Sequence, residues 1–341
     1  MKTAIVILNW NGAAMLRRFL PSVVANTPAE LADIIVADNA STDDSMETLR
    51  CSFPGVQTLR LDKNYGFAGG YQRALRLLGD RYAYFLLLNS DIHTPQGWLQ
   101  PLVNYMDNHP DVAACQPKLL AEHDHGSFEY AGAAGGYIDS LGYPFCRGRV
   151  FSHVERDSGQ YDNVADVFWA TGATLLIRPA DYWGVGGLDE RFFAHQEEID
   201  LCWRLRARGR RIVCVASSHV YHVGGGTLPK ENPQKTFLNF RNNLLLLYKN
   251  MPAARLHAVM RRRYWLDALA SLMFLCKGEV GSCRAVWRAR RAFGRMRRDF
   301  ADDRRRNLEA TTLDPIPEML QQSLLAAFHL RRRHTFAVIM A

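Results

Sequence analysis

The apolar run 82–88 is followed by Asn89, Ser90 and Asp91, so a carboxylate comes directly after a predicted buried strand. A hard divalent cation such as Mg²⁺ or Mn²⁺ prefers one or two carboxylates together with diphosphate oxygens. The structural alternative is that Asp91 caps a helix that begins near Pro95. The sequence therefore offers either a metal ligand or a helix cap at this position.

Two further segments have side chains or backbone suited to a nucleotide. Asp38 ends the apolar run 32–37 and could accept an N–H from a base, although the segment 41–43 could simply cap the next helix. Glycines 66, 69 and 70 could let backbone N–H groups approach a phosphate at a helix N-terminus, with Lys63 as a counter-charge. A tight turn would explain the same glycines.

The segment 195–209 carries acids at helical spacing, with Glu197 and Asp200 three residues apart and Glu198 on a neighbouring face. These acids could interact with the dipole of a helix N-terminus. One of them could instead accept a proton from an acceptor hydroxyl. His222 follows another apolar run, where an imidazole is either structural or completes a metal site.

The elements that must position these groups alternate between strands and helices. Strands are predicted over 3–9, 32–38, 56–61, 82–89 and 112–116, and helices over 13–25, 43–51, 68–78 and 97–108. This alternation predicts βαβ units and a largely parallel sheet covered on both faces. Ligands of such sheets bind outside the carboxyl ends of the strands, where the polar residues fall.

The second half of the pattern is less regular. We predict a loop or small hairpin over 117–165, then strands over 167–177 and 211–217 and helices over 197–208 and 237–250. A dinucleotide-binding fold would need GxGxxG directly after the first strand, where this chain has NWNGAA. That class is therefore excluded.

The charge of the 341-residue chain is concentrated in its C-terminal part. Residues 1–254 carry 24 Lys and Arg against 26 Asp and Glu, whereas residues 255–341 carry 18 against 8. We therefore predict a catalytic domain over 1–254 and a basic helical extension over 255–341. A nucleic-acid-binding protein would more often spread its basic surface across the fold that reads the groove, so no nucleic-acid partner is expected.

The basic extension has features of a membrane-surface segment. Its apolar run 264–276 contains Asp267 and is shorter than the ~20 residues of a membrane span. The segment 283–300 has an apolar stripe among arginines, a pattern typical of helices on anionic lipid, although packing on the catalytic domain is the alternative. That stripe consists of Val286, Ala289, Phe293 and Met296.

Cysteine usage and the N-terminal sequence bear on the compartment. The seven cysteines are scattered without CxxC spacing, and no signal peptide is predicted. Disulfides are rare in the cytosol. We therefore expect a cytoplasmic protein, peripheral on the cytoplasmic face of the inner membrane.

Taken in order, these motifs resemble those of the family 2 glycosyltransferases, which have the GT-A fold. The resemblance covers about residues 3–250 and rests on VILNWNG (6–12), VADNASTDDS (36–45), NYGFAGGYQRAL (64–75), LLLNSD (86–91), the segment 169–209 and HVYHVGGGT (219–227). It is closest to the bacterial branch that includes rhamnosyltransferases of cell-surface polysaccharide synthesis. It implies an α/β GT-A fold with a mostly parallel central sheet flanked by helices.

The resemblance also implies a role for each candidate site residue. The expected donor-binding residues are Asp38, which would bind the base, and Asn9, Asn11, Asn39, Lys63, Gly66, Gly69, Asn89 and Ser90. The expected metal ligands are Asp91 and His222, and the expected catalytic pair is Glu197 and Glu198, with Glu198 as the base. The expected acceptor side of the cleft consists of Trp169, Thr171, Gly172 and Asp200. Two residues depart from the family pattern, because Asn89 and Glu198 stand where the family has aspartates.

The implied reaction is transfer of a sugar, with inversion, from a nucleoside diphosphate donor to a hydroxyl of a saccharide or lipid-linked saccharide. Mg²⁺ or Mn²⁺ would assist it. A catalytically inactive nucleotide-sugar-binding protein is the first alternative, since Asn89 and Glu198 are compatible with it. A nucleotidyltransferase is the second, although the Gly-rich basic loop expected directly after its first strand is absent.

Overall fold

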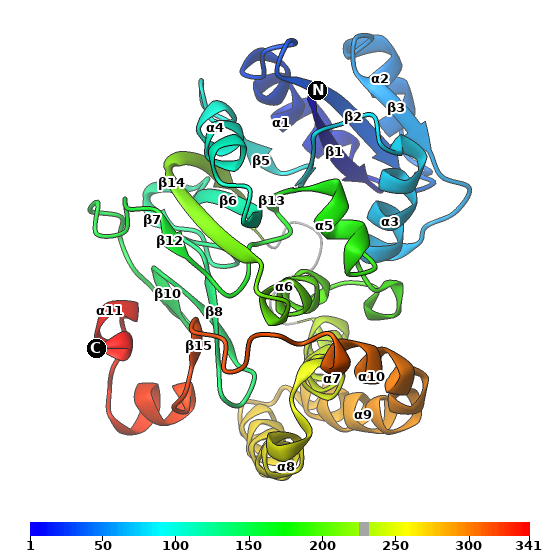
Figure 1. Cartoon of the computed structure of the whole chain (residues 1–341). Helices are drawn as coiled ribbons and strands as arrows, with labels where there is room; N and C mark the ends of the chain where they lie inside the picture. The colour runs from blue at the N-terminus through cyan, green and yellow to red at the C-terminus, as the bar shows by residue number, and fades with distance from the viewer. Residues whose placement is uncertain (225–231) are drawn as a thin grey trace.

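The computed structural model describes residues 1–224 and 232–341, and its central element is a ten-stranded mixed sheet (Figure 1). Its main path has the strand order β12-β14-β6-β13-β4-β1-β2-β3. These strands are β12 (Ala165–Asp166), β14 (Arg211–His222), β6 (Val112–Ala121), β13 (Thr174–Ile177), β4 (Tyr84–Leu88), β1 (Thr3–Asn9), β2 (Ala32–Asp38) and β3 (Gln57–Arg60). Two further strands, β5 (Ile92–His93) and β7 (Asp124–Phe128), pair with β14 and β6.

The sheet is mostly parallel, as predicted, with one reversed strand in its middle. β1 runs parallel to β2 and β4, β2 to β3, and β6 to β14. β13 runs antiparallel to both β4 and β6. The segment that precedes β13 therefore lies at the edge where the parallel strands end, beside the loop that follows β4.

Helices cover both faces of this sheet. They are α1 (Ala13–Ala25), α2 (Ser45–Ser52), α3 (Gly66–Leu78), α4 (Gln100–Asn108), α5 (Pro179–Gly184) and α6 (Glu197–Ala207). Successive side chains of a strand point to opposite faces, so Ile5 and Ile7 of β1 join the core that includes α1, whereas Ala4 and Val6 join the core that includes α3. Burial on both faces explains the continuous apolar runs that predicted these strands.

The segment 117–165 departs from its prediction as a loop or small hairpin. It contributes most of a second, five-stranded sheet in the order β11-β10-β9-β8-β15. These strands are β8 (Gly136–Asp139), β9 (Pro144–Cys146), β10 (Arg149–Val150), β11 (His153–Val154) and β15 (Met319–Leu320). The strands are short, and the sheet is completed by β15 from nearly 180 residues later, so local periodicity could not reveal it.

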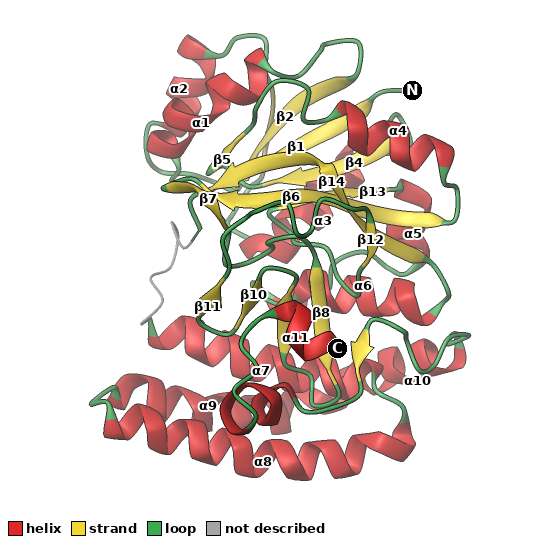
Figure 2. Cartoon of the chain, turned by 90° about the vertical axis from the view of Figure 1, so that its left-hand side faces the viewer, coloured by secondary structure: helices red, strands yellow, loops and turns green. Residues whose placement is uncertain are grey.

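A layer of helices lies beyond one face of the main sheet (Figure 2). It contains α7 (Pro233–Asn250), α8 (Ala253–Cys276), α9 (Val280–Met296) and α10 (Ala301–Glu309), and the chain ends with α11 (Phe336–Met340). Within residues 1–224 and 232–341 no helix has both the length and the apolar character of a membrane span.

The predicted lipid-facing stripe of the extension is covered by protein. Val286, Ala289 and Phe293 of α9 are buried, and the Phe293 ring lies 6.2 Å from that of Tyr248 on α7. Met296 is partly buried against the same core. The prediction that this stripe contacts lipid is therefore wrong, because its amphipathic pattern comes from packing on α7.

The proposed boundary at residue 254 remains a prediction, but many contacts cross it. β15 pairs with β8, Arg206 of α6 forms an ion pair with Glu318, and Arg191 forms one with Asp303 of α10. The extension is thus packed into the rest of the chain rather than suspended from it.

A buried ion network joins α6 to α7. The carboxylate of Asp200 is fully buried and accepts hydrogen bonds from Arg204, Lys249 and Asn250. The ammonium of Lys249 also lies 2.8 Å from Asp189. Burial opposes ionisation of Asp200, but the charges of Arg204 and Lys249 outweigh it and hold the pKa of Asp200 below its ordinary value.

Lys249→Met should therefore destabilise the protein strongly, because two buried carboxylates lose a shared cation. Breaking a buried pair by removing one partner costs about 3–5 kcal/mol, which urea denaturation would measure. The control is Lys2→Met, which removes a half-exposed pair with Asp33 and should cost less than ~1 kcal/mol. Equal losses in the two variants would show that the network contributes no more than a surface ion pair.

Candidate active site

The loops that follow the parallel strands bring an acid and a histidine from distant parts of the chain together. His222, the last residue of β14, pairs with Ile92 of β5, which places Asp91 beside its imidazole. Nε2 of His222 lies 3.1 Å from Oδ1 of Asp91, and the backbone N–H of Val223 donates to the Asp91 carbonyl. Asn89 lies on the same side, with its Nδ2 3.4 Å from His222 Nε2.

A third residue, Glu129, lies against the other nitrogen of the histidine. Its Oε1 is 3.3 Å from His222 Nδ1, an ion-pair distance without hydrogen-bond geometry. Its Oε2 accepts hydrogen bonds from the backbone N–H groups of Ala131 and Gly132, and the side chain is buried. Sequence reasoning missed Glu129, because it lies in the segment predicted as a loop and belongs to no motif.

His222 interacts electrostatically with the acids on its two sides, Asp91 and Glu129. Burial alone would lower the pKa of His222, but the carboxylates of Glu129 and Asp91 outweigh burial and raise it to about 10. Burial would raise the pKa of Asp91, but the hydrogen bond and charge of His222 hold it below its ordinary value. His222 is therefore an imidazolium between two carboxylates.

The helix-cap alternative for Asp91 is contradicted. The helix in question, α4, begins at Gln100 with Leu99 as its cap position, well beyond Pro95. The carboxylate of Asp91 faces His222 instead. After the second strand, Asp43 accepts hydrogen bonds from the N–H and hydroxyl of Ser45, the first residue of α2, whereas the cap position itself is Asp44.

The two glutamates at the start of α6 have different environments. The chain enters this helix through left-handed backbone at His195 and Gln196. Glu197 is buried, whereas Glu198 is only partly buried. In each, Oε2 has no hydrogen-bond partner among the described residues, which is unusual for a buried carboxylate oxygen.

Burial raises the pKa of both glutamates. That of Glu198 is raised to about 7, although backbone N–H groups at the helix start partly offset the effect. That of Glu197 is raised well above its ordinary value by burial and by the charge of Glu198. Glu197 therefore stays protonated while Glu198 ionises near neutral pH.

Of the four predicted acceptor residues, only Gly172 borders this pair. A side-chain carbon at Gly172 would lie 3.7 Å from Cβ of Glu198. Thr171 is buried in the turn before β13, where its backbone N–H donates to Gln116.

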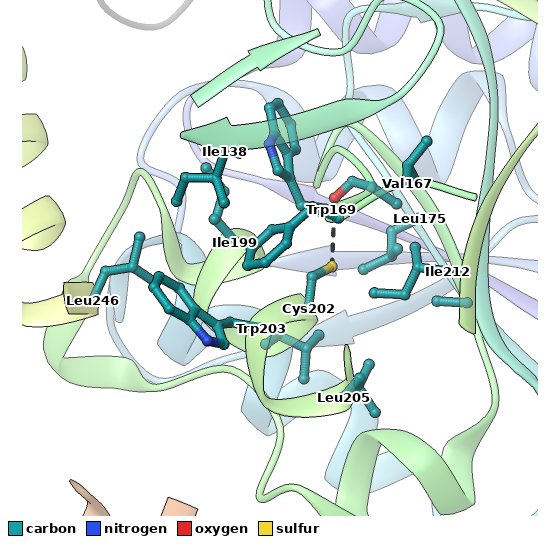
Figure 3. Close-up of a cluster of buried hydrophobic side chains, with 14 of the residues drawn as sticks. Ile138, Val167, Trp169, Leu175, Ile199, Cys202, Trp203, Leu205, Ile212 and Leu246 are labelled. Carbon is teal, nitrogen blue, oxygen red and sulfur yellow. Dashed lines mark hydrogen bonds between the residues drawn. The ribbon is translucent and has the colours of Figure 1, made fainter. Parts of the chain in front are cut away.

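The other two predicted acceptor residues are corrected by the structure. Trp169 is buried in the core beside Ile138 and Ile199, and its Nε1 donates to the carbonyl of Tyr137 (Figure 3). Asp200 is fully occupied by the ion network described above. Both side chains stabilise the interior of the protein. Their positions within a motif do not distinguish this structural role from ligand binding.

The predicted base-binding residues Asn9 and Asp38 are buried at the ends of β1 and β2. Nδ2 of Asn9 donates to Asp38 and to Ser41, and the second oxygen of Asp38 accepts the Ser41 N–H. Asn11 stands beyond them with left-handed backbone and accepts from the N–H of Thr42. These bonds fix the two loops against each other, and binding of the base by Asp38 remains a prediction.

The glycine-rich start of α3 is held in a similar way. Asn39 accepts the Tyr65 N–H and donates to the Gly66 carbonyl. Gly66 has a φ of +70°, and the N–H groups of Phe67 and Ala68 donate to the carbonyl of Phe193. These helix-start N–H groups are occupied, which favours the tight-turn alternative for the glycines.

Donor binding by Gly66, Gly69 and Lys63 stays a prediction. The Lys63 side chain is exposed, with Nζ 5.1 Å from the ring of Tyr65. Ser90, the other predicted donor residue in the fourth loop, is partly exposed. The last part of the motif 219–227 lies outside the described residues.

The chemistry of Asp91 and His222 fits a divalent cation. In the described part of the chain no cluster of three acidic, histidine or cysteine side chains is arranged for a metal. Asp91 and His222 nonetheless supply a carboxylate oxygen and an imidazole nitrogen that face each other, with the Asn89 amide beside them. Such an incomplete set suits a cation that takes further ligands from a diphosphate. An imidazole ligand must be neutral, so a cation at this site would have to displace the extra proton of His222, whose pKa is raised to about 10.

Comparison with known sequences finds a family match and several relatives. Residues 4–135 match the family model described as glycosyl transferase family 2. The chain is 27% identical over 232 residues to an N-acetylglucosaminyl-diphospho-decaprenol L-rhamnosyltransferase of Mycobacterium tuberculosis, an alignment that covers 64% of this chain and 75% of that protein. It is 26% identical over 163 residues to the rhamnosyltransferase WbbL of Escherichia coli K12, covering 46% of this chain and 61% of that one.

Solved structures share the fold at low sequence identity. S. aureus TarS 1–349 superposes with a TM-score of 0.52 at 13% identity, covering 91% of this chain and 89% of that one. The mannosyltransferase PcManGT from Pyrobaculum calidifontis, in complex with GDP-Man and Mn²⁺, gives 0.52 at 12% identity, with coverage of 91% and 85%. Together, the fold of a GT-A glycosyltransferase, the match of residues 4–135 to glycosyl transferase family 2 and the rhamnosyltransferase relatives support a glycosyltransferase.

Proposed function

We propose that this glycosyltransferase moves a deoxyhexose such as rhamnose, with inversion, from a nucleoside diphosphate donor to a hydroxyl of a lipid-linked saccharide. The observation that carries the proposal is the partly exposed Glu198, whose carboxylate has an unpartnered oxygen and a pKa of about 7. The name of the mycobacterial relative supports the acceptor class, since it describes rhamnosyl transfer to a decaprenol-linked diphosphosugar.

Glu198 is proposed as the general base. A base works best when its pKa lies near the operating pH, and that of Glu198 is raised to about 7. Glu197 shares the helix start but remains protonated, so it cannot compete for the acceptor proton. Two carboxyl groups with pKa values pushed apart by their environments commonly divide acid and base roles in this way.

Asp91 and His222 are proposed to hold a divalent cation, which when bound would stabilise the charge of the departing diphosphate. PcManGT carries Mn²⁺ together with its GDP-mannose. Asn89 replaces one carboxylate of the family motif, so this chain offers the cation a smaller negative charge. The identity of the cation as Mn²⁺ or Mg²⁺ is part of this proposal.

The donor is proposed to lie over the loops after β1 to β4. The predicted residues that reach solvent there are Asn11, Lys63, Asn89 and Ser90. Buried Asn9, Asp38 and Asn39 would hold those loops in position through the hydrogen bonds described above. In this proposal the exposed residues contact the donor, and the buried residues hold the exposed ones in position.

We also propose peripheral attachment to the cytoplasmic face of an anionic membrane. The net charge of +10 in residues 255–341 supports it, since basic residues near such a surface each add favourable energy. Attachment would bring the cleft to a lipid-linked acceptor. The same proposal divides the chain into a catalytic domain over 1–254 and a basic extension.

Glu198→Gln should lower kcat by ~10²–10⁴-fold while the donor Kd stays close to that of the wild type. Nucleoside diphosphate release, with a polyprenyl-diphospho-sugar as acceptor, measures turnover, and calorimetry measures donor binding. Because the base must be ionised, kcat/KM of the wild type should rise with pH through about 7 and then level off.

Glu197→Gln is the matched control for that variant. It replaces the neighbouring carboxyl, which is already protonated, by a neutral amide of similar size, so it should retain most activity and leave the rise in kcat/KM near pH 7. If instead Glu197→Gln is inactive and Glu198→Gln is active, the base has been assigned to the wrong residue.

Asp91→Asn should weaken donor binding in Mn²⁺ at least about tenfold, because a metal-bound group loses a charged ligand. In EDTA the variant and the wild type should bind the donor equally. Asp111→Asn, which changes an exposed acid paired with Arg211, is the control and should change neither value. If Asp91→Asn binds the donor in Mn²⁺ as tightly as the wild type does, Asp91 is not a metal ligand.

A further inference from the structure

The outer side of α8 exposes large apolar side chains to solvent. Trp265, Leu272 and Met273 are 69%, 55% and 50% exposed, and Leu269 is 54% exposed. Together with exposed Cys276 they recur every three or four residues, so they form one side of the helix, which we name the α8 face. In Figures 1 and 2, α8 is the outermost helix on the side away from the main sheet.

The one acidic residue of α8 points the other way. Asp267 is fully buried and forms ion pairs with Arg263 of its own helix and Arg290 of α9. Ser271, one turn further on, is also buried and lies against Cys283 of α9. The helix therefore keeps its acid and its polar contacts on the inner side, and the α8 face carries no negative charge.

Exposed arginines border the α8 face at one end and along one side. Arg261 and Arg262 lie one turn before Trp265 on the same side of the helix. On α9, exposed Arg284 and Arg291 flank Trp287, whose ring lies 6.1 Å from that of Tyr264 on α8. In the described part of the chain none of these four arginines forms an ion pair with a carboxylate.

We propose that the α8 face lies on an anionic lipid bilayer, with the side chains of Trp265, Leu269 and Leu272 in the boundary between headgroups and acyl chains. This inference rests on the membrane attachment proposed above and assigns it to a surface. Helices with a basic side and a Trp- and Leu-rich side lie in the plane of such an interface. Trp favours that depth, and the arginines can contact anionic headgroups.

The charges favour lipid over a second copy of the chain as the partner. A symmetric dimer through the α8 face would use the same patch on both subunits. Because that patch carries no acid, neither subunit would offer a carboxylate to the arginines of the other. An anionic bilayer instead supplies the counter-charge that the described residues lack.

The inner contacts of α8 would then link the membrane to the catalytic helix. α8 packs on α9 through Asp267 and Arg290, α9 packs on α7 through Phe293, and α7 holds α6 through Lys249 and Asp200. α6 begins with Glu197 and Glu198. This chain of buried contacts would hold Glu198 at a fixed height above the bilayer.

Vesicle flotation of the full chain tests the proposal. The wild type should float with phosphatidylcholine vesicles that contain phosphatidylglycerol, should not float with phosphatidylcholine alone, and should be released as salt screens the charges. The variant Trp265→Ser/Leu269→Ser/Leu272→Ser should reduce the floated fraction at least about tenfold, and Arg261→Gln/Arg262→Gln should reduce it less.

The matched control is Val24→Ser/Leu77→Ser, which removes exposed apolar side chains of α1 and α3 and should float like the wild type. Thermal unfolding of every variant checks folding, and Trp265→Ser alone replaces the triple variant if that variant does not fold. Donor turnover without lipid is measured in parallel, so that a failure of the catalytic proposal is seen separately.

Two results would overturn the inference in different ways. If the wild type fails to float, membrane attachment itself is wrong. If the wild type and the triple serine variant float equally, attachment stands but the α8 face is not its surface. Light scattering that shows a wild-type dimer and a monomeric triple variant, without flotation, would assign the face to a second copy.

Discussion

The contact between Asp91 and His222 is the interaction on which the proposed site depends. It joins the ends of β4 and β14 across 131 residues of sequence, through the pairing of β5 with β14. The register of β14 against β6 shifts between Val215 and His219, and the pairing continues past this irregular point to His222. A single cationic imidazole then lies between the partly buried carboxylate of Asp91 and the buried carboxylate of Glu129.

The site contains two pairs of acids whose charges differ because their partners differ. Asp91 and Glu129 have a shared cation, so the pKa of Asp91 lies below its ordinary value. Glu197 and Glu198 have only backbone N–H groups and burial, so their pKa values are raised. The same fold thus keeps one acid ionised for an electrostatic role and another near its pKa for proton transfer. This difference in pKa between the two pairs of acids arises from residues at the strand ends and at the start of α6.

The strand ends could be predicted from the sequence, whereas the partners that surround them could not. Apolar runs buried on both faces revealed β1, β2 and β4, and the acid that follows β4 is Asp91. The roles of Glu198 and His222 came from the resemblance and stay predictions. Glu129 was missed because only the fold brings its loop to His222. Trp169, Asp200 and the stripe of α9 were misassigned for one shared reason: a pattern shows that a side chain has a preferred face, but not whether ligand, lipid or another helix covers it.

The most direct test of the account is a crystal structure of the chain with a nucleoside-diphosphate-sugar and Mn²⁺, with the metal located by its anomalous scattering. The account predicts one manganese peak within about 2.0–2.3 Å of a carboxylate oxygen of Asp91 and of Nε2 of His222. It also predicts that the anomeric carbon of the donor faces the carboxylate of Glu198. A manganese ion bound away from Asp91 and His222, or a donor sugar whose anomeric carbon has no path to Glu198, would contradict it.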